Sequence, residues 1–195
     1  MKIIDPEKIQ QRCRLLVGLN ENLQVVRAMA GLEEALRAGK KILVFGNGGS
    51  ATQSSHFAAE LVNKFYFRRQ ALPVLALSAD MANVTSIAND EDFQFVFSRQ
   101  VEAFAAKGDV ALGITTSGRS VNVLRALTEA RKRNLLTVVL AGRQVEALQA
   151  IPVDILVSVD AEDTPTIQEM HLFLLHVMAE TIEKNIFGGK HDSTV

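Results

Sequence analysis

Five short apolar segments recur along the chain, and they limit its possible folds more than any other feature of the sequence. Each is six or seven residues long and almost wholly apolar, as expected of parallel strands that helices cover on both faces. The five segments are Lys41–Gly46, Leu72–Ser78, Asp109–Thr115, Leu135–Ala141 and Val153–Val159. The intervening stretches have helical spacing: 50–64, 79–88, 93–105, 120–132 and 144–150. This alternation predicts an α/β fold with one doubly wound, five-stranded parallel sheet.

Longer helices are expected at both ends of this unit. The first runs from about Pro6 to Arg37 with breaks near Gly18 and Gly31, and the last covers about 164–185. The last helix is apolar around its whole circumference over 172–178, so it has to be buried. Because one domain covers only one face of a peripheral helix, we expect another subunit to cover the rest and the protein to be an oligomer.

Length, charge and cysteine content narrow the class of protein. With 195 residues, one domain over 1–195 is expected, with an N-terminal helical segment at 1–37 packing in the oligomer and a core at 41–187. A net charge of -1 gives the protein no overall positive potential that would attract a polyanion, so no nucleic-acid partner is expected. The single Cys13 fits a reducing compartment, and no signal peptide or membrane span is predicted. We therefore expect a cytoplasmic protein with no membrane partner.

Two polar loops follow predicted strands, at the sheet edge where open parallel sheets bind ligands. Gly46-Asn47-Gly48-Gly49-Ser50 comes after the first strand, where glycines let backbone N–H groups approach an anion at a helix N-terminus. Thr115-Thr116-Ser117-Gly118-Arg119-Ser120 comes after the third, with hydroxyls suited to a phosphate monoester. Taken singly, the first could be a tight turn and Ser120 a helix cap. Together the two loops favour a small phosphorylated ligand.

The glycine loop also matches the loose dinucleotide fingerprint G-x-G-x-x-A, which leaves a nicotinamide oxidoreductase as an alternative. The fingerprint expects an acidic residue about 20 positions further on. In this chain, the first acid after the next strand is Asp80, 34 residues beyond Gly46. Neither loop carries the G-K-[ST] signature of a nucleotide P-loop.

His56 and Glu60 are four residues apart in the helix expected after the glycine loop, so both side chains lie on one helix face. They could share a metal ion or a substrate, and a glutamate held near a sugar can remove a carbon-bound proton. A surface contact between helix neighbours explains the spacing equally well. On the last helix, Gln168 and His176 are separated by a rise of about 12 Å. Spacing alone does not require them to converge, and His176 could be an ordinary helix histidine.

Taken together, these segments resemble the phosphoheptose isomerases of the sugar isomerase (SIS) domain superfamily. The resemblance runs from about 41 to 187 and rests on four ordered segments. These are GNGGSATQSSHFAAEL (46–61), SIANDEDF (86–93), GDVALGITTSGRSVNV (108–123) and IQEMHLFLLH (167–176). The resemblance implies an SIS-type fold and conversion of sedoheptulose 7-phosphate to D-glycero-D-manno-heptose 7-phosphate through an enediol. It further implies a role in making the nucleotide-activated heptose of surface polysaccharide.

The resemblance also implies a cofactor, an assembly and roles for individual residues. One Zn²⁺ per subunit would be held by His56, Glu60, Gln168 and His176, in active sites at the interfaces of a homotetramer. Glu60 and His176 would be the catalytic acid/base pair. The implied substrate-binding residues are Asn47, Gly48, Gly49, Glu60, Asn89, Asp90, Thr115, Thr116, Ser117, Ser120 and Gln168.

The chain departs from the family pattern in a few places. Lys64 stands where arginine is frequent, Pro165-Thr166 replaces a pair that usually contains arginine, and Thr115 replaces a commoner serine. These changes leave the implied metal and acid/base residues intact but bear on sugar specificity. The alternative to an enzyme is a non-catalytic SIS-domain protein that senses sugar phosphates or binds a replication initiator. Retention of Glu60 and His176 favours the enzyme.

Overall fold

The computed structural model describes residues 5–188 and contains the five-stranded parallel sheet predicted from the sequence. Its strands are β1 (Ile42–Gly46), β2 (Val74–Ala76), β3 (Val110–Thr115), β4 (Leu136–Ala141) and β5 (Ile155–Ser158), in the order β2-β1-β3-β4-β5. Each strand lies inside the segment expected for it. β1 pairs with β3 from Ile42↔Val110 to Gly46↔Ile114, so the two strands end side by side.

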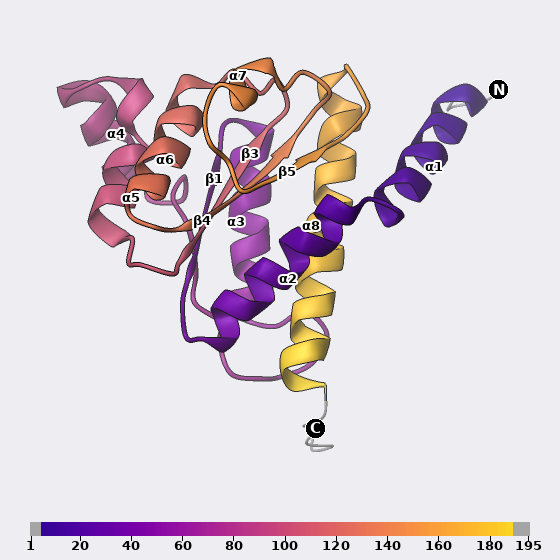
Figure 1. The fold of residues 1–195 in the computed structure, drawn as a ribbon, viewed down its shortest axis with the longest axis horizontal. Helices are drawn as coiled ribbons and strands as arrows, with labels where there is room; N and C mark the ends of the chain where they lie inside the picture. The colour runs from indigo at the N-terminus through magenta and orange to yellow at the C-terminus, as the bar shows by residue number, and fades with distance from the viewer. Residues whose placement is uncertain (1–4, 189–195) are drawn as a thin grey trace.

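Helices cover both faces of the sheet, which confirms the doubly wound α/β fold (Figure 1). One face packs against α2 (Leu23–Arg37), α3 (Gly49–Val62) and α8 (Thr164–Phe187), and the end of α1 (Pro6–Asn20) packs against α8 beside them. The other packs against α4 (Met81–Asp90), the 3₁₀ turn η1 (Phe93–Phe95), α5 (Ser98–Phe104), α6 (Val121–Lys132) and α7 (Glu146–Gln149). Neighbouring β1 residues point to opposite cores: Val44 joins the first and Phe45 the second. Period-two alternation with both faces covered explains why the strand segments are apolar throughout.

One expected helix break is absent. The N-terminal segment does break close to Gly18, since α1 ends at Asn20 and α2 begins after Asn22, whose side chain accepts from the Gln24 N–H. Gly31, however, lies inside α2. A Cβ at Gly31 would come within 2.5 Å of Leu136 Cδ2, so this glycine allows α2 to approach β4 closely. The sequence-based interpretation of Gly31 as a breaker was therefore wrong.

α8 and α1, the helices at the two ends of the chain, differ in how much of their surface is buried within one chain. On α8, Leu174, Leu175 and Met178 are buried, while Phe173 is 43% exposed. α1 projects from the body of the molecule (Figure 1), and its Val17 is exposed. Over residues 5–188, no helix is both long and apolar enough to cross a membrane.

Candidate active site

The sheet order places both predicted loops at one point. The strand order reverses direction between β1 and β3, and ligands of open α/β sheets bind beyond the carboxyl ends of strands at such a switch point. The glycine loop leaves β1 here and the hydroxyl loop leaves β3 beside it. Their proximity follows from topology and needs no specific side-chain contact.

The glycine loop delivers the N-terminus of α3 to this point. Gly48 has φ 54° and ψ -122°, a backbone conformation that a residue with a Cβ adopts only at a cost. Within the described chain, no side chain caps the first turn of α3. The helix N-terminus thus keeps N–H groups available to an anion. A side chain on Gly49 would collide with the Gln168 amide of α8, so glycine also permits the close approach of these two helices.

The side chains of the hydroxyl loop differ in their hydrogen bonds and in their exposure. Ser120 occupies the N-cap position of α6 but makes no capping bond, and its hydroxyl is 3.4 Å from Thr115 Oγ1. Thr115 Oγ1 accepts from the Gly118 N–H at 3.2 Å. Ser117 is exposed, and its hydroxyl accepts from the Arg119 N–H. The expectation that Ser120 could simply cap a helix is not borne out, because its hydroxyl faces Thr115 instead.

We call the cavity formed by these loops the strand-end pocket; its volume is about 300 Å³. It is lined by Asn47, Gly48, Gly49, Ser50, Ile114, Thr115, Thr116, Ser120, Thr164 and Gln168. Seven of the predicted substrate-binding residues are in this set. Its polar groups are hydroxyls, amides and helix N–H groups, which suit a phosphate. A larger groove of about 560 Å³ between α5 and α6 contains none of the predicted site residues.

A second cavity of about 480 Å³ adjoins the pocket and shares Asn47 and Ser120 with it. Its wall includes Asn122, a buried residue of α6 that sequence reasoning missed. The Asn47 and Asn122 amides exchange two hydrogen bonds, of 2.9 and 2.8 Å, which fix the orientation of Asn47. Asn122 follows the hydroxyl loop by two residues, and only the fold reveals that it faces Asn47.

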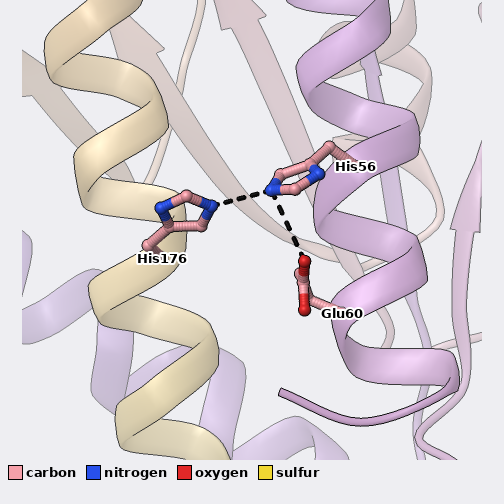
Figure 2. A group of neighbouring side chains, drawn as sticks. All are labelled: His56, Glu60 and His176. Carbon is pink, nitrogen blue, oxygen red and sulfur yellow. Dashed lines mark hydrogen bonds and ion pairs between the residues drawn. The ribbon is translucent and has the colours of Figure 1, made fainter. Parts of the chain in front are cut away.

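A second group of side chains lies between α3 and α8, and we call it the helix seam: His56, Glu60 and His176 (Figure 2). The Nε2 atoms of the two histidines are 2.7 Å apart, a hydrogen bond in which one ring donates and the other accepts. Glu60 Oε1 is 3.5 Å from His56 Nε2. The side chain of His56 is 42% exposed and that of Glu60 24%, so the seam is open to solvent in a single chain.

The helix seam has the donors of a metal site. One potential ligand atom from each of its three residues lies within 4.8 Å of the others. Two imidazoles and a carboxylate form a set that catalytic zinc sites use, with a position left for substrate or water. Both Nε2 atoms would be ligands of a bound ion, so the ion would replace the His56–His176 hydrogen bond. The residues present therefore fit a metal ion.

Gln168, the fourth ligand implied by the resemblance, is part of the strand-end pocket. Its amide is packed against Gly49, and its backbone carbonyl accepts from Gln53 Nε2 at 2.7 Å. It is about 12 Å along α8 from His176. Its role as a ligand stays a prediction.

Four predicted substrate-binding residues lie outside the strand-end pocket: Glu60, which is part of the helix seam, and Asn89, Asp90 and Ser117. Asn89 and Asp90 are exposed at the end of α4, where the Asn89 amide donates to the Asp90 carboxylate at 2.7 Å. Asp92, Phe93 and Gln94, a few residues further on, line the adjoining cavity instead. Ser117 lines neither cavity. The roles assigned to Asn89, Asp90 and Ser117 stay predictions.

His171 connects α8 to the end of β4. It is fully buried, its Nε2 is 3.2 Å from the Ala141 carbonyl, and its Nδ1 is buried without a hydrogen-bond partner in the described chain. Burial lowers the pKa of this imidazole to about 4. His171 is therefore neutral at pH 7, and it lies on α8 between Gln168 of the pocket and His176 of the seam.

Comparison with known proteins identifies relatives of the same size. The sequence profile of the SIS domain family matches residues 9–142. A phosphoheptose isomerase from Thermodesulfovibrio yellowstonii is 45% identical over 168 residues, covering 86% of this chain and 83% of that protein. One from Geobacter metallireducens is 48% identical over 163 residues, covering 83% and 86%.

Solved structures agree with this grouping. A phosphoheptose isomerase from Neisseria gonorrhoeae superposes with a TM-score of 0.83 at 37% identity, covering 91% of this chain and 94% of that one. Another from Francisella tularensis gives a TM-score of 0.85 at 31% identity, covering 91% and 95%. By its sequence and its fold, this chain belongs to the phosphoheptose isomerase family of SIS-domain proteins.

Proposed function

We propose that this protein interconverts sedoheptulose 7-phosphate and D-glycero-D-manno-heptose 7-phosphate. The reaction moves a proton between C1 and C2 of the sugar while the phosphate remains on C7. An enzyme for this reaction needs an anion site and an acid/base site, separated by about the length of the sugar chain. The strand-end pocket and the helix seam meet that requirement.

The spacing of these two regions is the observation that carries the proposal. Gly49 lies at the pocket and His56 at the seam, seven residues along α3, which corresponds to a rise of about 10 Å. An extended seven-carbon chain with a phosphate at one end is of comparable length. Its C1 and C2 would therefore reach the seam when its phosphate lies in the pocket.

In this reaction Glu60 would act as the base that removes the proton from the sugar carbon. A carboxylate at this position can take the proton from one carbon and return it to the neighbouring one through an enediol. His176, across the seam on α8, would move the proton between the two sugar oxygens. Asn47, held by Asn122, would orient the sugar hydroxyls between pocket and seam.

We propose Zn²⁺, one per subunit, as the cofactor, with His56, Glu60 and His176 as ligands and Gln168 as the fourth. When bound, the ion would stabilise the negative charge that develops on the sugar oxygen. The two-histidine and carboxylate donor set supports zinc over Mg²⁺ or Ca²⁺, which prefer all-oxygen sites.

We further propose a homotetramer with active sites at subunit interfaces. The half-exposed seam and the exposed apolar side chains of Val17, Val26 and Phe173 support burial by other subunits. The cytoplasm is the proposed compartment, and synthesis of nucleotide-activated heptose for surface polysaccharide is the proposed pathway.

The test is incubation of purified, zinc-loaded protein with sedoheptulose 7-phosphate in deuterated water, followed by NMR. Aldose that carries deuterium at C2 is expected, because a base exposed to solvent exchanges the proton it removes. Absence of turnover with the sugar phosphate still bound would contradict the proposal and favour a non-catalytic sensor. Turnover of a different phosphosugar would support the proposed isomerase activity but contradict the proposed substrate.

A further inference from the structure

A buried ion pair lies about two turns beyond His176 on α8. The Arg69 guanidinium approaches the Glu183 carboxylate with Nε 3.1 Å from Oε1, and their side chains are 2% and 0% exposed. In every other ion pair of residues 5–188, at least one side chain is substantially exposed. Burying two charges is costly, and the cost is offset only where hydrogen bonds satisfy both groups.

Glu183 satisfies its carboxylate with the segment that follows α3. Its oxygens accept from the N–H groups of Phe65 at 2.8 Å and Tyr66 at 2.6 Å, and from Phe67 at 3.4 Å. The chain leaving α3 is thus fastened to α8 through its backbone. Because backbone groups are held, the side chains of the segment are placed by the position of Glu183.

Arg69 continues the connection back to α3. Its Nη2 donates to the Glu60 carbonyl at 2.9 Å, and its Nη1 donates to the Leu61 carbonyl at 2.6 Å and to the Asn63 carbonyl at 3.2 Å. The last carbonyls of a helix have no partner within the helix. Arg69 supplies that partner for the turn that carries Glu60, which is only two residues from the end of α3.

The same segment also contacts the other side of the seam. The Phe65 ring packs beside the His176 imidazole, with centroids 5.8 Å apart. One carboxylate therefore fixes the backbone of Phe65, whose ring contacts His176, and binds Arg69, which holds the Glu60 carbonyl. Both proposed acid/base residues are connected to Glu183 through one intermediate residue each: Glu60 through Arg69, and His176 through Phe65.

We propose that Arg69 and Glu183 are positioning residues that set the separation of Glu60 and His176. This inference rests on the proposed function, since it concerns the geometry of the same site. Without the pair, the Glu60 carbonyl would lose its hydrogen bond from Arg69, and the Leu61 carbonyl would keep only its bond from the Leu72 N–H. The last turn of α3 would then open more readily, and Phe65 would no longer be held against His176. Neither residue of the pair lines the strand-end pocket or belongs to the helix seam.

The first test is Glu183→Gln, which keeps the shape of the side chain and removes its charge. Residues that orient metal ligands change metal affinity or activity by about 10- to 100-fold when mutated. We expect that loss in zinc affinity, measured on metal-free protein by competition with a chromophoric chelator. We expect a similar loss in kcat with KM within about twofold of wild type, because the strand-end pocket is at the opposite end of the contact between α3 and α8.

A second variant applies if Glu183→Gln does not fold. Arg69→Lys keeps the positive charge beside Glu183, but a lysine cannot bridge the carboxylate and the Glu60 carbonyl as the guanidinium fork does. It should fold and show a smaller loss of zinc affinity in the same direction. Glu180→Gln is the matched control, because it removes an exposed ion pair with Lys184 from the same helix. It should leave zinc affinity and kcat unchanged.

A stability control distinguishes a specific effect on the positions of Glu60 and His176 from a general loss of protein stability. Leu127→Ala removes a core side chain on the opposite face of the sheet and lowers stability without touching the seam. If it reduced zinc affinity as much as Glu183→Gln at a comparable fall in Tm, the positioning role would be overturned. Wild-type protein that binds zinc but does not turn over substrate would contradict only the proposed function. Wild-type protein that binds no zinc would overturn both.

Discussion

The strand-end pocket and the helix seam are built from different parts of the fold. The pocket is formed by loops that leave adjacent strands, so the hydrogen bonds of the sheet bring its two halves together. The seam is formed by side chains 120 residues apart that meet only because α3 packs against α8. The comparison indicates that topology determines the strand-end pocket, whereas helix packing determines the helix seam.

The two regions should also respond differently to mutation. The pocket offers many similar groups, including helix N–H groups that no side-chain replacement removes. The seam depends on a few side chains in distinct roles. Changes at the seam should therefore lower kcat steeply, and changes at the pocket should raise KM moderately.

Glu60→Gln should have the largest effect. Replacing the base with an amide keeps its shape and removes its ability to take a proton, so kcat should fall by about 10³-fold, equivalent to about 4 kcal/mol. Fold and oligomer size should be unchanged. The measurement is the rate of aldose formation by NMR, with Glu180→Gln as the exposed control. Substantial turnover by Glu60→Gln would remove Glu60 from the mechanism.

This contrast also explains what the sequence could predict. The apolar segments predicted all five strands and the doubly wound sheet, and the rule that open parallel sheets bind ligands beyond the carboxyl ends of their strands placed both loops at the ligand-binding edge. That the two loops lie side by side depends on the strand order, in which β1 is next to β3. The i, i+4 spacing correctly placed His56 and Glu60 on one face of α3. That His176 faces them depends on the packing of α8, which no local pattern encodes; only the resemblance to a family suggested it.

Other features could not be predicted from local sequence patterns, because they too depend on how the helices and strands pack. Asn122 and the Arg69–Glu183 pair act through partners distant in sequence, and Glu183 on its helix resembles an ordinary solvated charge. Gly31 was misinterpreted because a glycine that breaks a helix and one that admits a neighbouring side chain have the same sequence signature. The distant partner of a side chain and the role of a helix glycine are both determined only when the elements pack against one another.

His171 lies on the stretch of α8 that the two regions share, and its protonation should loosen both. Its pKa is about 4 when folded, against 6.5 without burial. Between these values the unfolded chain binds a proton that the folded chain does not. The free energy of unfolding should therefore fall as pH drops from 6.5 to 4, by up to about 3 kcal/mol.

The measurement is urea unfolding of metal-free wild type and His171→Gln across this pH range. Glutamine can still donate to the Ala141 carbonyl but does not titrate, so its stability should depend less on pH. Other titrating groups are common to both proteins and cancel in the difference between their slopes. Identical slopes would show that burial of His171 contributes nothing to acid sensitivity.

Removal of the metal should affect the seam and spare the pocket. A ligand present at 100 times its dissociation constant stabilises the folded protein by about 2.7 kcal/mol. Chelation should therefore lower Tm by roughly 5–10 °C and abolish turnover. Binding of the sugar phosphate, measured by calorimetry, should persist in weakened form. Unchanged Tm on chelation, or complete loss of phosphosugar binding, would contradict the division into two regions.

Ser120→Ala should have the smallest effect. Together with Ser117→Ala, it tests where the phosphate-binding part of the pocket ends. One hydrogen bond to a charged phosphate contributes about 1.5 kcal/mol, so KM should rise roughly tenfold with kcat nearly unchanged. Stability should hold, because the Ser120 hydroxyl makes no cap for α6. Ser117→Ala is the matched control from the same loop, and its exposed hydroxyl should be dispensable. An equal rise in KM for Ser117→Ala would mean that the phosphate site extends beyond the pocket formed by a single chain.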